Sequence, residues 1–155
     1  MRPGSLTAAL VLAMFGLAAC GESSTSTSTT TPQETATAEV CSARADIAAQ
    51  IKKLEGLPVA TSSITEAKKG LEAITADVHT IKNAQPELAA PRKEQVEAAT
   101  AAFGQTLASV SSNAAKAVLL SGSGAGLSSA EAELKAALSE LSKSYRQTLG
   151  PISCP

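Results

Sequence analysis

The sequence is poor in the residues that most often carry chemistry. Its 155 residues include one histidine, three cysteines and no tryptophan, and aromatic residues make up 2% of the chain. The formal net charge of −1 leaves no basic excess for a nucleic-acid surface, which needs clustered lysines and arginines. Strands draw on aromatic and β-branched residues, so their scarcity favours helices packed through small side chains. The length fits one domain.

Signatures of catalysis and of cofactor binding are also missing. His79 is the only histidine, so a Ser-His-Asp triad would depend on it, and no pattern nominates it. The glycine-rich segment 121–126 follows a predicted helix and lacks the Gly-Lys-Ser/Thr of a phosphate loop. The carboxylates do not follow the Glu-x-x-His spacing of di-metal bundles. We therefore expect no enzyme, no cofactor and no metal site.

The first 20 residues have the layout of an export signal. Arg2 precedes an apolar run over 6–19, which is too short to span a bilayer of about 30 Å but suits the apolar region of a signal peptide. The run ends in Leu17-Ala18-Ala19-Cys20, an order of aliphatic, small, small and cysteine. This segment resembles the lipobox of bacterial lipoprotein precursors.

That resemblance implies that residues 1–19 are a signal peptide, cleaved before Cys20, and that the Cys20 thiol takes a diacylglycerol. Two or three acyl chains anchor firmly, because each buried CH₂ contributes about 0.8 kcal/mol. We expect an exported protein, lipid-anchored to the cell membrane and facing outside the cytoplasm. The alternatives are an ordinary secretory signal or an uncleaved anchor. The sequence leaves open whether the anchor lies in an inner or an outer membrane.

Residues 20–38 are predicted to be the lipidated cysteine followed by a disordered tether. The stretch after Cys20 reads GESSTSTSTTTPQETATA and has no apolar periodicity. Such a segment buries too little surface to offset the entropy lost on ordering. The simplest interpretation is a spacer that lifts the domain off the membrane. Its Ser/Thr run is also compatible with O-glycosylation.

If Cys20 is acylated, Cys41 and Cys154 remain as one pair. An exported location is oxidising, so we expect a disulfide between them, with two free buried thiols as the alternative. Closing a loop of about 113 residues would stabilise the fold by roughly 4 to 5 kcal/mol in the chain-entropy treatment. A core poor in aromatic residues gains from such a covalent link.

Residues 39–155 are predicted to form a helical domain. Each segment carries one apolar stripe at helical spacing, with Phe103 and Tyr145 as the large core side chains. Two S-x-x-E capping boxes, beginning at Ser63 and Ser128, are expected to start the second and fourth helices. The four expected helices run over about 39–55, 64–83, 91–120 and 129–149.

Short connections make neighbouring helices antiparallel, which predicts an all-α, antiparallel four-helix bundle. In such a bundle the start of the first helix and the end of the last lie at the same end, where Cys41 and Cys154 fall. A three-helix arrangement would separate the two cysteines by about a helix length, beyond disulfide reach. The helix count and the cysteine positions therefore support each other.

The sequence favours a non-catalytic structural or protein-interaction role in the cell envelope. We expect a monomer that is held to the membrane by its lipid. Its expected partner is an envelope protein, whose identity the sequence does not give. The alternative is a small-molecule or lipid-binding module that uses a cavity between the helices, because small core residues leave room for one.

Overall fold

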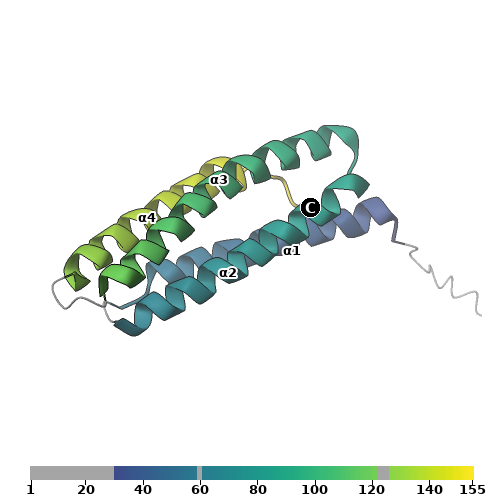
Figure 1. Cartoon of the computed structure of the whole chain (residues 1–155). Coiled ribbons are helices and arrows are strands. Elements are labelled where there is room, and N and C mark those ends of the chain that lie inside the picture. The colour runs from purple at the N-terminus through teal and green to yellow at the C-terminus, as the bar shows by residue number, and fades with distance from the viewer. Residues whose placement is uncertain (1–29, 59–60, 122–125) are drawn as a thin grey trace, which may run out of the picture.

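The computed structural model describes residues 30–58, 61–121 and 126–155. The predicted signal peptide, Cys20 and most of the predicted tether lie outside these residues. The described part contains four α-helices and one short 3₁₀ helix: α1 (Pro32–Glu55), α2 (Thr61–Ala84), η1 (Gln85–Glu87), α3 (Ala90–Ser121) and α4 (Leu127–Thr148). The predicted all-α, antiparallel four-helix bundle is confirmed (Figure 1).

The bundle is built from two antiparallel hairpins. α1 packs on α2, α3 packs on α4, and the hairpins join through contacts of α2 with α3 and of α1 with α4. Figure 1 shows the C-terminus near the first turns of α1, at the end where α2 passes into α3. We call this the disulfide end. The last turns of α1 and α3 and the first turns of α2 and α4 lie at the opposite, distal end (Figure 1).

The core follows the apolar stripes that the sequence predicts. Phe103 is fully buried and is the largest side chain in the core, whereas aliphatic residues and alanines fill most of the remainder. Alanine lets helices approach closely and costs no side-chain entropy in a helix. Besides Phe103, the stripe residues exposed by less than 2% are Val40 and Ile47 in α1, Ala67, Ile74 and Ile81 in α2, Val96 and Ala117 in α3, Leu141 in α4, and Leu149 just after α4.

α1 begins at Pro32, and not near residue 39. The prediction of a disordered tether up to residue 38 was therefore wrong for residues 32–38, which are helical. The physical reason is a capping box. The backbone N–H of Glu34 donates to Thr31 Oγ1 at 3.2 Å, and Thr31 N–H donates to Glu34 Oε2 at 2.7 Å. Pro32 suits the first helical position, and Ala36 is buried at 3% exposure.

The two capping boxes predicted from sequence were not found. Ser63 lies inside the first turn of α2, and its hydroxyl donates to the carbonyl of Pro58. α4 starts at Leu127, and its N-cap residue is Gly126, which has no side chain to cap with. In both places the helix begins before the serine, so the N–H of the glutamate that the serine would cap already has a carbonyl partner within the helix.

α3 is the longest helix, with 32 residues against 22 in α4. At about 1.5 Å per residue, the two differ in length by roughly 15 Å. The C-terminal tail, residues 149–155, continues past the end of α4 and buries Leu149 and Ile152. Arg92, in the first turn of α3, donates to the Ser153 carbonyl at 2.5 Å. The first turns of α3 therefore pair with the tail, which accounts for the extra length.

Candidate functional site

The predicted partnership of Cys41 and Cys154 is present as a disulfide. Cys41 lies in α1 and Cys154 in the C-terminal tail, with their Cα atoms 5.7 Å apart. That separation falls within the usual range for a disulfide. The bond links α1, in one hairpin, to the tail that follows α4, in the other. The two hairpins are thus joined covalently at the disulfide end.

Two arginines add polar ties at the same end. Arg44 Nη1 donates to the carbonyl of Ile152 and, at 3.4 Å, to that of Gly150. Arg92 Nη2 donates to the Ser153 carbonyl and approaches Cys41 Sγ at 3.8 Å. A guanidinium offers five donors, so one side chain can hold several carbonyls of an irregular tail. Sequence reasoning missed both arginines.

Each of the two arginines has one nitrogen that lacks a hydrogen-bond partner in the part of the chain that the structure describes. The Nε atoms of Arg44 and Arg92 are buried and have no hydrogen-bond partner among the described residues. An unpaired buried donor costs about 1 to 3 kcal/mol. The hydrogen bonds to the tail carbonyls therefore come with a desolvation cost, and the disulfide provides the covalent part of the same connection.

The aromatic pair lies between this end and the middle of the bundle. The rings of Phe103 and Tyr145 meet edge to face, with centroids 6.3 Å apart and planes at 78°. This is a favoured geometry for aromatic pairs. The Tyr145 hydroxyl donates to the Arg44 carbonyl at 3.3 Å, which links α4 to α1. The predicted core position is confirmed for Phe103, whereas Tyr145 is only partly buried and uses its hydroxyl.

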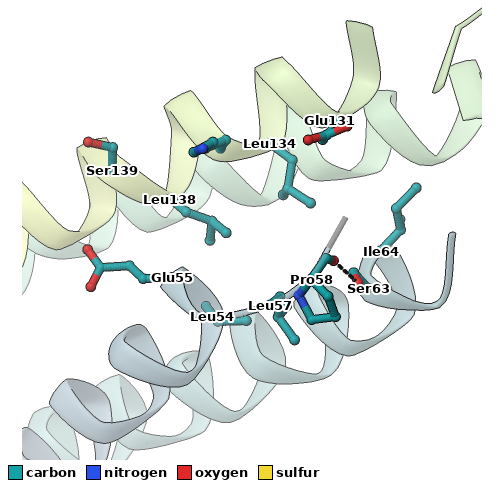
Figure 2. Close-up of a pocket in the computed structure, with 11 residues that line it drawn as sticks. Leu54, Glu55, Leu57, Pro58, Ser63, Ile64, Glu131, Leu134, Leu138 and Ser139 are labelled. Carbon is teal, nitrogen blue, oxygen red and sulfur yellow. Dashed lines mark hydrogen bonds between the residues drawn. The ribbon is translucent and has the colours of Figure 1, made fainter. Parts of the chain in front are cut away.

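The distal end contains a pocket of about 330 Å³ between the hairpins (Figure 2). One wall comes from the end of α1 and the start of α2, and the other from the first turns of α4. In Figure 2, Leu134 and Leu138 of α4 point toward Leu54 and Leu57 across the space. The apolar side chains of the lining are Leu54, Leu57, Pro58, Ile64, Leu134 and Leu138.

Charged groups at the pocket lie on its rim. Glu55 and Lys135 are exposed and Glu131 is partly exposed. None of the three forms an ion pair with another residue in the described ranges. The Ser63 hydroxyl donates to the Pro58 carbonyl, so this polar group within the lining already has a partner. The pocket thus combines an apolar interior with a rim that carries two carboxylates and one ammonium.

One carboxyl pair lies away from both ends. Burial raises the pKa of Asp77 on α2 above its ordinary value, and the nearby charge of Asp46 on α1 raises that pKa further. A nearby negative charge disfavours the ionised form of a carboxyl group, which is why both causes act on Asp77 in the same direction. In contrast, the hydrogen bonds from Thr31 hold the pKa of Glu34 below its ordinary value.

The remaining residues considered for chemistry are spread out. His79 is exposed on α2, beside buried Val78. Two of the carboxylates that lack the spacing of di-metal bundles, Glu94 and Glu97, are exposed near the start of α3. Across the described residues, no group of three or more histidine, cysteine, aspartate or glutamate side chains is arranged to hold a metal ion. Gly122 and Gly124 lie outside the described residues.

None of the described helices combines the length and the hydropathy needed to cross a membrane. In comparisons with models of known protein families, with curated proteins and with solved structures, no match to this chain was found.

Proposed function

We propose that this chain is an exported lipoprotein, cleaved before Cys20 and anchored by lipid on that cysteine, with a non-catalytic structural or protein-interaction role in the cell envelope. The observation that carries the export part is the Cys41–Cys154 disulfide. Disulfides form and persist in oxidising compartments and are rare where thiols are kept reduced. The disulfide and the export signal predicted from residues 1–20 are independent features that favour the same location.

The direction of the bundle supports an interaction role. The chain enters α1 at the disulfide end, so a tether from Cys20 would hold that end toward the membrane (Figure 1). α1 has 24 residues, which corresponds to about 36 Å of helix. The distal end would then be the part of the protein most accessible to other envelope components. Leu119, near the distal end of α3, is 80% exposed.

The anchor is tested by Cys20→Ser in the native cell. We expect the wild-type chain to incorporate labelled palmitate and to sediment with membranes, and the variant to do neither. The matched control is the double variant Cys41→Ser/Cys154→Ser, which removes the same type of side chain without touching the lipobox and keeps the label. A Cys20→Ser chain that still carries palmitate and still sediments would contradict the proposal.

The interaction role is tested by site-specific photo-cross-linking in intact cells. A cross-linking side chain at Leu119 probes the distal end, and one at Gln147, exposed on α4 near the disulfide end, serves as the control. We expect a discrete cross-linked species from position 119 and none from position 147. The absence of any discrete species from the distal position would show that this end does not contact a partner.

A further inference from the structure

The two ends of the bundle hold the hairpins together in different ways. Hydrogen bonds that cross between the hairpins run from Arg44 to the tail, from Tyr145 to Arg44, and from Arg92 to Cys41 Sγ, and they cluster with the disulfide at one end. At the distal end the same hairpins face each other across an apolar pocket (Figure 2). Of the four pairs of adjacent helices, α1 and α4 contact each other least. The pocket therefore lies at the end of the bundle that, among the described residues, lacks these hydrogen bonds between the hairpins.

The dimensions of the pocket fit one small molecule. Its volume of about 330 Å³ is at the lower end of the range for ligand sites, roughly 300 to 1,000 Å³. It is about twice the volume of an apolar cavity of roughly 150 Å³ that accepts benzene. The leucines of both walls would contact an apolar body of this size. Ser63 has its hydroxyl proton committed to Pro58, so the interior favours a ligand without polar groups along its buried part.

The charges on the rim of the pocket indicate which ligand charge the pocket would favour. Glu55 and Glu131 contribute two negative charges and Lys135 one positive charge, which leaves an excess of one negative charge. In the view of Figure 2, the two glutamates lie at opposite ends of the pocket with the leucines between them. Both carboxylates lack an ion-pair partner among the described residues. A cationic group at either end of a bound apolar body would therefore meet an unpaired carboxylate.

We propose that the distal pocket binds a small amphiphilic cation, with a compact apolar body and one ammonium group. The apolar body lies between the leucines of α1 and α4 and supplies most of the affinity through burial of its surface. The ammonium group stays at the rim, near Glu55 or Glu131, and remains in contact with water. An exposed charge pair contributes little, so the charge changes affinity by about two- to fivefold and not by orders of magnitude.

The test uses three ten-carbon probes that differ only in the head group: decylammonium, decanol and decanoate, each below its critical micelle concentration. The protein is the full chain with Cys20→Ser, which has no lipid of its own to compete. Binding is followed by calorimetry and localised by methyl NMR shifts of Leu134 and Leu138. We expect all three to bind at the pocket, decylammonium about two- to fivefold tighter than decanol and decanoate weakest.

Two sets of variants separate charge from shape. Glu55→Gln/Glu131→Gln is expected to abolish the preference for decylammonium over decanol, whereas Glu133→Gln/Glu140→Gln removes two exposed charges of α4 outside the pocket and is expected to preserve it. Ile64→Trp places a larger side chain in the pocket and is expected to weaken all three probes at least tenfold. Circular dichroism checks whether Ile64→Trp is folded. If this variant does not fold, the glutamine variants still test the proposal.

The proposal is overturned if no probe gives saturable binding with shifts at Leu134 and Leu138, or if decanoate binds as tightly as decylammonium. Equal loss of preference in both glutamine double variants would also overturn it, because a general field of the protein would then explain the effect. None of these results affects the anchor or the distal contact, which the Cys20→Ser and cross-linking experiments test separately.

Discussion

The disulfide end and the distal end of this bundle use the same four helices with different chemistry. At the disulfide end a covalent bond, two arginines and a tyrosine hydroxyl link elements that are far apart in the sequence. At the distal end the walls are aliphatic, and a pocket separates them. Directional bonds specify a single arrangement, whereas aliphatic contacts tolerate small displacements. The comparison suggests that stability is concentrated at the disulfide end and that the distal end is left adaptable.

The largest expected effect comes from removing the disulfide. Cys41→Ser/Cys154→Ser is expected to lower the free energy of unfolding by about 2 to 5 kcal/mol, because the unfolded chain regains the freedom of a long loop. Urea denaturation followed by circular dichroism measures the loss, and reduced wild-type protein is the control. Hydrogen exchange would sharpen the comparison, since among amides that exchange by local opening, those near the tail should lose more protection than those lining the pocket. Equal loss in these locally exchanging amides at both ends would contradict the proposed division.

Core truncation near the middle of the bundle and at the distal end should give unequal costs. Phe103→Ala removes the largest fully buried side chain and its contact with Tyr145, and is expected to cost about 3 to 5 kcal/mol. Leu134→Ala enlarges a space that is already open, so we expect a cost near the lower limit for such changes, about 2 kcal/mol. Thermal and urea unfolding of both variants checks the order. Equal costs would indicate that the distal end is packed as tightly as the rest of the core.

The smallest expected effect concerns Asp77, between the two ends. Its pKa is raised, so its contribution to stability is present below its ordinary pKa of about 3.8 and is lost as the pH rises through the higher folded value. Asp77→Asn is therefore expected to be more stable than wild type at pH 7, by no more than about 0.5 kcal/mol because solvent screens the pair. The difference should shrink at pH 3. Glu133→Gln, at an exposed position on α4, is the control and should show no such trend.

The sequence predicted the features that depend on local periodicity. The apolar stripes identified from helical spacing make up most of the buried core, and Cys41 and Cys154 are paired as expected. The N-terminal limit of α1 was wrong, although a signal for it was present. Thr31-Pro32-Gln33-Glu34 has the T-x-x-E pattern of a capping box with proline at the first helical position. The Ser/Thr-rich composition around it obscured that pattern.

The misplaced caps at Ser63 and Ser128 show the opposite case. Both serines are followed by glutamate three residues later, which is the expected local pattern. Ser63 nevertheless bonds to the carbonyl of Pro58 in the preceding connection, and the helix starts before it. A capping pattern reports only what four consecutive residues favour by themselves. The position of the chain entering the helix decides whether the hydroxyl is used in that way.

Residue order alone thus determined the number of helices, the face that each one buries, and the pairing that closes the bundle, because these depend on short-range periodicity and on the placement of few cysteines. Only the tertiary structure decided where Arg44 and Arg92 bind, since their carbonyl partners lie 106 and 108 residues away for Arg44 and 61 residues away for Arg92. It also decided that leucines of α1 and α4 leave a pocket between them. A void depends on how side chains from distant segments fit together, and no local pattern in the chain encodes that fit.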